Sequence, residues 1–168
     1  MINTVTLHGN QFNLIGNTIK NGEKAPDFNV LNQKMEEVSL KDFEGKVKII
    51  SVTPSLDTPV CDAQARFFNK KASELSEDIV ILNISVDLPF AISRFCTAAN
   101  IDRVHVLSDH KDVSFGMNYG LLIEKLRLLA RAILIIDRED KIKYIQIVNE
   151  VGDSPDFESV FNKLADIV

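Results

Sequence analysis

The chain has 168 residues, of which 45% are hydrophobic and 26% are charged. This length and composition suit one soluble domain with a buried core, so we expect residues 1–168 to form a single domain and exclude disordered and collagen-like classes. The formal net charge of −5 argues against a surface for nucleic acid or for anionic membranes, because both would repel an acidic protein.

No targeting segment is predicted. The amino-terminal stretch MINTVTLHGNQFNLIG lacks a basic start and a continuous apolar run, so we expect no signal peptide. The longest apolar run, Ala132–Ile136, is too short to cross a bilayer. We therefore expect a cytoplasmic protein. The two cysteines do not make a secreted disulfide scaffold, and in a reducing cytosol such a pair is more often catalytic, redox-sensing or incidental.

Strand signals dominate the first third of the chain. Residues 5–7 and 12–14 alternate apolar with polar side chains around the turn HGNQ, which predicts an amino-terminal β-hairpin. A short strand is expected near Phe28–Leu31. Lys46–Val52 is rich in β-branched residues and predicts a buried strand. From Pro59 onward the apolar spacing predicts a helix, because proline is tolerated in a first helical turn.

Strands and helices alternate through the rest of the chain. Asp87 is expected to cap the second helix, because an aspartate accepts the free amide protons of a first turn. The order of elements predicts a mixed sheet flanked by helices, which is the plan of a thioredoxin-like α/β domain. The remaining predicted elements are a strand at Ile79–Val86, a helix from Asp87 to about Asn100, a strand at Val104–Asp109, a short helix at Val113–Tyr119, hairpin strands at Ile133–Ile136 and Ile142–Ile145, and a tail helix at Phe157–Ile167.

The segment TPSLDTPVCDAQARFF, residues 53–68, places a cysteine at a strand-to-helix junction. In this reading Cys61 lies in the first helical turn, where unpaired N–H groups and the helix dipole favour a thiolate over a thiol. Thr58 can turn its hydroxyl toward the same sulfur or toward a bound oxygen. Pro54 and Pro59 lack N–H groups, so they can shape the pocket without adding a competing donor.

This segment also carries a resemblance to a known family. Pro54-x-x-x-Thr58-x-x-Cys61 resembles the signature of the peroxiredoxins. The longer SLDTPVCDAQ, with RFCTAANI and VHVLSD downstream, is similar to the bacterial thiol peroxidase branch, the atypical two-cysteine peroxiredoxins. The likeness covers nearly the whole chain. It implies a thiol-specific peroxidase that reduces hydrogen peroxide and organic hydroperoxides to water and alcohols.

The resemblance implies a role for each residue that matches the family motif. Cys61 matches the peroxidatic cysteine, which attacks the O–O bond and becomes a sulfenic acid. Cys96 matches the resolving cysteine, which condenses with that sulfenic acid into an intramolecular disulfide. Thr58 matches the hydroxyl that holds the peroxide, and Pro54 matches the residue that screens the pocket. Arg131 matches the arginine that pairs with the thiolate and orients the peroxide.

The resemblance extends to neighbouring groups and to partners. Gln64 occupies a place where relatives often carry a polar residue that helps hold the arginine. Reduction by thioredoxin, a homodimer and a role in antioxidant defence are also implied. The chemistry agrees, because cleaving an O–O bond leaves negative charge on the departing oxygen, which a fixed guanidinium and hydroxyl stabilise. No metal or cofactor is required.

Some residues keep alternative interpretations. Asn100 stands where a glycine is expected after a helix, but asparagine also tolerates the left-handed conformation. Arg127, which we expect one helical turn before Arg131, competes for the arginine role. Thr58 could act only as a helix cap. Taken without the family, Cys96 is as readily a core residue as a redox residue.

Two other classes of protein remain open at the level of sequence. Thioredoxin-like disulfide reductases usually carry two cysteines two residues apart, whereas positions 61 and 96 are 35 apart. A non-enzymatic binding domain could use the same pair as a structural disulfide, since closing such a loop stabilises a fold by roughly 4 kcal/mol. The histidines at 8, 105 and 110 show no metal-ligand spacing and are read as structural or solvated.

Overall fold

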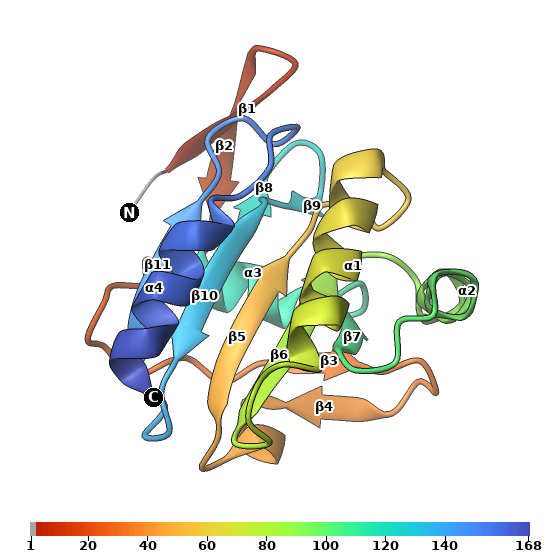
Figure 1. Ribbon diagram of the computed structural model, residues 1–168. Helices are drawn as coiled ribbons and strands as arrows, with labels where there is room; N and C mark the ends of the chain where they lie inside the picture. The colour runs from red at the N-terminus through yellow and green to blue at the C-terminus, as the bar shows by residue number, and fades with distance from the viewer. Residues whose placement is uncertain (1–2) are drawn as a thin grey trace.

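A seven-stranded sheet forms the centre of the molecule (Figure 1). The computed structural model describes residues 3–168. In the sheet, β5 pairs in parallel with β6 and β6 with β7, while the remaining neighbours run antiparallel, which confirms the predicted mixed sheet. The strands, in spatial order, are β11 (Ile142–Ile147), β10 (Ala132–Ile136), β5 (Val47–Val52), β6 (Ile79–Ser85), β7 (His105–Ser108), β3 (Asn29–Leu31) and β4 (Glu37–Ser39).

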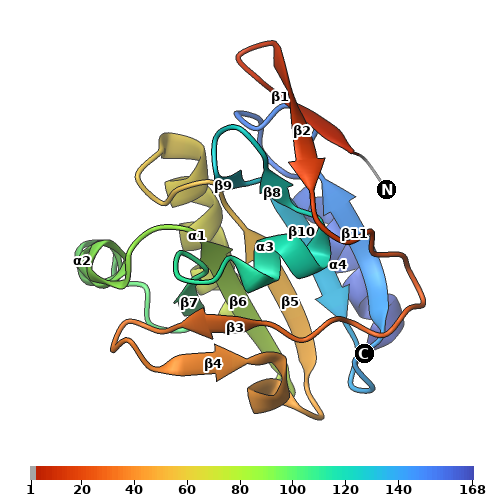
Figure 2. The same ribbon diagram turned by 180° about the vertical axis from the view of Figure 1, so that it is seen from behind.

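Helices cover both faces of this sheet. In Figure 1 the helices α1 and α4 lie in front of the central strands, and in Figure 2, turned by 180°, α3 lies in front of them. The cores agree: side chains of α1, α2 and α4 share one buried cluster, whereas those of α3 belong to another. The helices are α1 (Pro59–Ala72), α2 (Pro89–Ala99), α3 (Ser114–Tyr119) and α4 (Phe157–Ile167), with a short 3-10 turn η1 at Leu40–Phe43.

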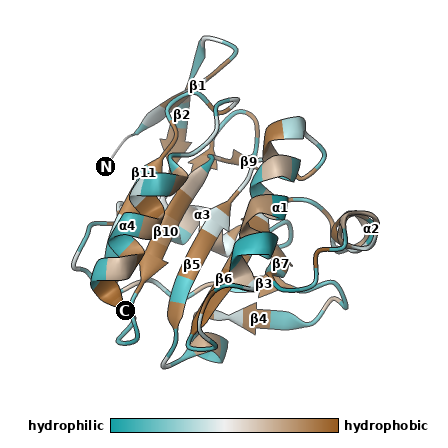
Figure 3. Cartoon of the chain, viewed as in Figure 1, coloured by the Kyte–Doolittle hydropathy of each residue, from teal (hydrophilic) through white to brown (hydrophobic). Residues whose placement is uncertain are grey.

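The central strands are mostly apolar because both faces of the sheet are covered; the polar residues of β5, Lys48 and Ser51, are buried as well. Every residue of β5 and β10 is buried. Neighbours in a strand point to opposite faces, so Ile49 packs beneath α1 while Ile50 packs on the α3 side. Figure 3 shows the result as brown, hydrophobic ribbons in the middle of the molecule.

A second, smaller sheet lies at one end of the molecule, at the top of Figure 1. It contains the predicted amino-terminal hairpin, β1 (Thr4–Leu7) and β2 (Asn10–Ile15), which pair antiparallel around the turn. It also contains β8 (Leu122–Ile123) and β9 (Leu128–Leu129), which the sequence did not predict. The carboxyl end of β9 leads directly into Arg131 and β10, so this sheet lies next to a candidate site residue.

The predicted start and end of α2 have different outcomes. Asn100 is confirmed as the left-handed residue after the helix, with φ 55° and ψ 43°. The prediction that Asp87 caps the helix is wrong: Leu88 occupies the cap position, and no side chain caps it. Asp87 instead accepts hydrogen bonds from the loop that precedes α1.

Asp109, directly after β7, is a buried carboxyl group that we expect to make stability depend on pH. It is 1% exposed and accepts hydrogen bonds from the N–H groups of Phe115 and Gly116. Burial raises the pKa of Asp109 to about 6, against the lowering effect of those two N–H donors, and Asp112 adds to the rise.

Because the folded-state pKa of Asp109 lies above its unfolded value, the folded protein holds the proton more tightly. The contribution to stability is therefore complete below about pH 4 and is lost as the pH rises through 6. The loss should be about 3 kcal/mol. In urea unfolding of Asp109→Asn across pH 4 to 6, the free energy of unfolding should lack this pH-dependent component. The exposed Asp112→Asn should keep most of it, because Asp112 is the smallest of the causes that shift this pKa. If the free energy of unfolding changed with pH in the same way in wild type and in Asp109→Asn, Asp109 would not be the source of the pH dependence.

No helix within residues 3–168 is both long enough and apolar enough to cross a bilayer.

Candidate active site

Cys61 lies at the end of the loop that joins β5 to α1. The chain leaves the buried strand at Val52, and α1 begins at Pro59, where proline is favourable because the first helical N–H groups have no helical partner. Cys61 is thus the third residue of α1, as predicted, and it is 0% exposed. Its sulfur is held at the amino-terminal end of a helix, where the dipole favours negative charge.

Arg131 contacts this sulfur directly. Its Nη2–H donates to Cys61 Sγ at 3.2 Å, its Nη1–H donates to Gln64 Oε1 at 2.8 Å, and its Nε–H donates to the Val151 carbonyl at 2.8 Å. All three sides of the planar guanidinium are therefore bound. This geometry fixes the orientation of the arginine against the thiol.

The buried charge of Arg131 is compensated by few groups. The side chain is 2% exposed, and within residues 3–168 it forms no salt bridge with a carboxylate. Of its three acceptors, an amide oxygen, a peptide carbonyl and a sulfur, only the sulfur can ionise. A buried cation without a counterion is costly, and the sulfur is the one acceptor of Arg131 that could supply a compensating charge.

A chain of buried, hydrogen-bonded polar groups holds the arginine in place. Gln64 Nε2 donates to Ser51 Oγ at 2.7 Å, which orients the amide so that its oxygen faces Arg131. Asn83 on β6 donates to the same Ser51 oxygen at 3.5 Å. Gln64, Ser51 and Asn83 are each at most 1% exposed. Gln64 therefore contacts Arg131 in the way the predicted holding role requires. Ser51 on β5 binds Gln64 in turn, and Asn83 on β6 binds Ser51.

Thr58 and Pro54 lie in the loop between β5 and α1, which precedes Cys61 in the chain. Thr58 is the residue before α1, but its side chain does not cap the helix, which argues against the simple cap interpretation. Its hydroxyl donates to the Ser55 carbonyl at 3.1 Å, and the residue is exposed. Pro54 is buried. In residues 3–168 no hydrogen bond joins the Thr58 hydroxyl to Cys61, so the structure does not bring these two groups together directly.

Asp87 fixes the loop that carries Pro54 and Thr58. Its carboxylate accepts from the Ser55 hydroxyl at 2.8 Å and from the Leu56 N–H at 2.7 Å. The Ser85 hydroxyl also donates to it, at 2.9 Å. The end of β6 is thereby tied to the loop before Cys61. This explains why Asp87 is not available as a helix cap.

Cys96 lies in α2 and has a different environment from Cys61. It is 5% exposed and packs in the core cluster under α1, α2 and α4. Burial raises the pKa of Cys96 to about 11, so this thiol stays neutral near pH 7. Both cysteines are free thiols. The prediction that Cys96 lies within a helix is confirmed, and its neutral state disfavours it as the first nucleophile.

A cavity of about 430 Å³ lies between the loop that precedes α1 and the helix α2. One wall is the loop of Ser55, Leu56 and Asp57, and the other is the face of α2 that includes Ala91, Phe95 and Ala98. Cys61 in α1 and Cys96 in α2 begin on distinct, regular helices. A disulfide requires the two Cα atoms to lie within about 7 Å with suitably directed Cβ atoms.

Arg127 does not share the position of Arg131. It is exposed, and it occupies the left-handed conformation (φ 56°) in the turn between β8 and β9. The interpretation that placed it one helical turn before Arg131 is wrong, because this segment is a hairpin. Of the two arginines, the structure places Arg131 against the sulfur.

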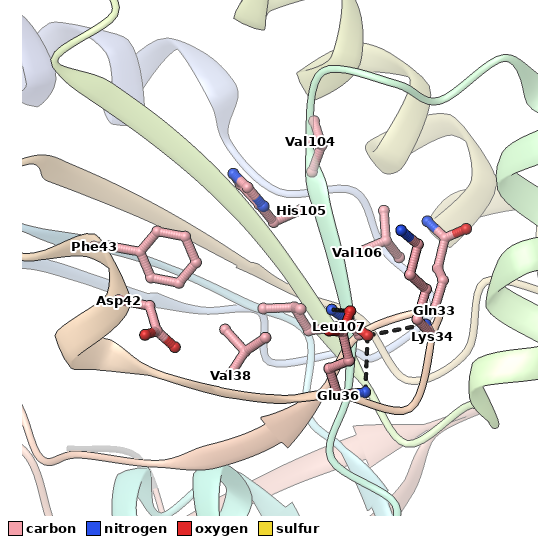
Figure 4. Close-up of a pocket in the computed structure, with 11 residues that line it drawn as sticks. Gln33, Lys34, Glu36, Val38, Asp42, Phe43, Val104, His105, Val106 and Leu107 are labelled. Atoms are coloured by element: carbon pink, nitrogen blue, oxygen red, sulfur yellow. Dashed lines mark hydrogen bonds between the residues drawn. The ribbon is translucent and has the colours of Figure 1, made fainter.

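Another cavity, of about 510 Å³, contains none of the predicted site residues (Figure 4). It lies between β7 and the β3–β4 hairpin. His105 lines it and packs edge-on against Phe43, with ring centroids 5.1 Å apart. Burial lowers the pKa of His105, and Lys46 lowers it further. Within residues 3–168 no group of three or more His, Cys, Asp or Glu side chains is placed to hold a metal ion.

Comparison with known proteins agrees with this geometry. The redoxin family profile matches residues 20–164. A thiol peroxidase of Staphylococcus saprophyticus is 48% identical over 97% of this chain and 98% of its own, and one of Staphylococcus aureus is 50% identical over 92% of this chain and 93% of its own. The chain belongs to the thiol peroxidases of the peroxiredoxin family. It is therefore an oxidoreductase of the peroxidase type, and the predicted resemblance is confirmed.

Solved structures confirm the fold of this family. A peroxiredoxin-like protein from Aquifex aeolicus superposes with a TM-score of 0.94 and 37% identity, covering 100% of this chain and 99% of its own. A thiol peroxidase from Chromobacterium violaceum superposes with a TM-score of 0.86 at 19% identity, over 97% of this chain and 96% of its own, a likeness of fold alone. The predicted thioredoxin-like α/β fold is confirmed.

Several groups at this thiol peroxidase site were not predicted. Ser51 and Asn83 had a signal in the sequence, because each is a polar residue inside an otherwise apolar strand. Asp87 was predicted as a helix cap and not as a residue that fixes the loop before Cys61. The Val151 carbonyl had no signal, because a main-chain oxygen is present at every position and only the tertiary structure selects one.

Proposed function

We propose that residues 1–168 act as one peroxidase domain that reduces hydrogen peroxide and organic hydroperoxides through Cys61. The observation that supports this most strongly is the buried contact between the Arg131 guanidinium and the Cys61 sulfur. A structural cysteine has no need of such a partner. A disulfide reductase would need two neighbouring cysteines, whereas here the second lies in another helix.

In the first step the Cys61 thiolate attacks the terminal oxygen of the hydroperoxide. The S–O bond forms as the O–O bond breaks, and the departing oxygen takes the bonding electron pair and a proton to leave as water or an alcohol. Arg131, and in this proposal the Thr58 hydroxyl, stabilise the negative charge that develops on the oxygens. Pro54 keeps water from the sulfur. Cys61 is left as a sulfenic acid.

In the second step Cys96 resolves this sulfenic acid. Its sulfur attacks the Cys61 sulfur, water leaves, and an intramolecular disulfide forms. Because Cys96 starts buried, protonated and in a separate helix, we propose that the first turn of α1 or the helix around Cys96 opens in each cycle. Thioredoxin then reduces the disulfide. The protein works as a cytoplasmic homodimer in antioxidant defence.

Cys96→Ser separates the two steps. This variant should consume one equivalent of peroxide as fast as wild type and then stop as a sulfenic acid, because no second thiol can condense with it. Thioredoxin-dependent turnover should end after that equivalent, and over-oxidation to the sulfinic acid should increase. Stopped-flow kinetics and mass spectrometry of the treated protein provide the measurement.

The wild-type protein supplies the complementary result. After peroxide treatment, peptide mass spectrometry should show a Cys61–Cys96 bond within one chain. An intermolecular bond, or full thioredoxin-linked turnover in Cys96→Ser, would refute the resolving role. Equal hydrogen-exchange protection around both cysteines in the reduced and disulfide forms would refute only the opening step.

A further inference from the structure

The loop between β11 and α4 supplies one of the three acceptors that hold Arg131. This acceptor is the Val151 carbonyl, which binds the Nε–H at 2.8 Å. A loop carbonyl can orient a side chain only as well as the loop itself is held. The groups that fix residues 149–152 therefore bear on the position of the arginine.

Glu150 is the side chain that fastens this loop. One carboxylate oxygen accepts from the Gly9 N–H at 3.0 Å and from the Thr6 hydroxyl at 3.3 Å, and the other accepts from the Gly152 N–H at 3.1 Å. The two N–H donors, with the Thr6 hydroxyl and nearby His8, lower the pKa of Glu150 despite partial desolvation, so the charged form is the one that binds.

Main-chain bonds place Glu150 between the amino-terminal hairpin and the loop. The Thr6 N–H donates to the Asn149 carbonyl at 2.7 Å, and the Val151 N–H donates to the Thr6 carbonyl at 2.8 Å. Val5 and Val151 are both buried in one small apolar cluster. The residue whose carbonyl binds Arg131 is thus anchored to β1 through its own N–H and through the side chain before it.

We infer that Glu150 is a positioning residue for the peroxidase reaction, which orients Arg131 against Cys61 by holding the Val151 carbonyl on the amino-terminal hairpin. This inference rests on the proposed function of Cys61 and Arg131. Glu150 itself does not touch the sulfur. Its removal should act on the rate of sulfenic acid formation through the arginine.

Glu150→Ala should slow the reaction of Cys61 with hydrogen peroxide by about 10- to 100-fold, the cost of misplacing a fixed catalytic group by a fraction of an ångström to 1 Å. The pH at which this rate reaches half its maximum should also move upward, because a displaced arginine stabilises the thiolate less. Glu150→Gln, which keeps one acceptor oxygen, should fall between Glu150→Ala and wild type. Stopped-flow kinetics across pH 4 to 9 measure both quantities.

Asp156 offers a matched control. Like Glu150, it is a carboxylate in the loop between β11 and α4. It accepts hydrogen bonds from the N–H and the hydroxyl of Ser159 at the start of α4. Asp156→Ala removes a comparable set of hydrogen bonds without touching the arginine. It should lower thermal stability while leaving the peroxide rate and its pH profile unchanged.

A double-mutant cycle separates positioning from a general loss of structure. If Glu150 acts through Arg131, then Glu150→Ala should have no further effect on the rate in an Arg131→Ala background. Additive effects, or a wild-type rate and pH profile in Glu150→Ala, would overturn the inference. If Glu150→Ala does not fold, Glu150→Gln takes its place in the same cycle. Should Arg131→Ala alone leave the rate unchanged, the proposed function fails instead, which is a distinguishable result.

Discussion

Cys61→Ser is expected to abolish peroxide reduction. A serine hydroxyl is not ionised near pH 7 and cannot form a sulfenic acid, so the rate should fall by more than about 10⁴-fold, to the background of the uncatalysed reaction. The fold should persist, because the serine oxygen can still accept from Arg131 Nη2 and the side-chain volume changes little. We expect the free energy of unfolding to change by roughly 1 kcal/mol.

The measurement is peroxide consumption in single-turnover and thioredoxin-coupled assays, with circular dichroism as the check on folding. Cys96→Ser is the matched control, since it removes the other buried thiol but should keep the first turnover. Persistent turnover in Cys61→Ser would end the proposal that Cys61 is the peroxide-reactive group. If both variants lost the first turnover of peroxide, the cause would be a disturbed core and not the loss of the peroxide-reactive thiol.

Arg131→Ala is expected to slow sulfenic acid formation by about 10²- to 10³-fold, the range seen when one preorganised donor to a developing negative charge is removed. The variant should also be less stable by about 2–4 kcal/mol, because it leaves a cavity and two buried acceptors, Gln64 Oε1 and the Val151 carbonyl, without a donor. The rate constant for the first equivalent of peroxide and urea unfolding measure the two effects.

Two further variants sharpen this prediction. Arg131→Lys should restore only part of the rate, because lysine keeps the charge but loses the planar fork that binds Gln64, Val151 and Cys61 together. Arg127→Ala removes an exposed arginine four positions earlier and should react at the wild-type rate. A slow Arg127→Ala with a normal Arg131→Ala would show that the wrong arginine had been chosen.

The fold was predictable where local pattern and tertiary packing agree. β5, β6 and β10 are largely buried on both faces, so each appears in the sequence as a mainly apolar, β-branched run that can be recognised without knowing its partner strands. β8 and β9 were not predicted, because two residues cannot show a period. They are strands only because the tertiary structure pairs β8 with β2 and β9 with β8.

The site was predictable where one side chain does the chemistry. Cys61 and Arg131 meet as expected, although they lie 70 positions apart. The first turn of α1 follows the carboxyl end of β5, and Arg131 precedes the amino end of β10, and these two ends are neighbours because the strands are antiparallel. Asp87 shows the limit. Its local sequence favours a helix cap. In the folded protein its carboxylate instead binds the Ser55 hydroxyl and the Leu56 N–H of the loop before Cys61, which lie about 30 positions away and cannot be inferred from local sequence.

The contact between Thr6 and Glu150 spans 144 positions, nearly the full length of the chain. Synthesis runs from the amino terminus, so a ribosome releases the β1–β2 hairpin well before residues 149–152. Until Val151 has emerged, the guanidinium of Arg131 lacks an acceptor and β1 lacks the segment that it binds. From the release of residue 61 until the release of residue 151, a nascent chain therefore carries the Cys61 thiol without the complete surroundings described for it.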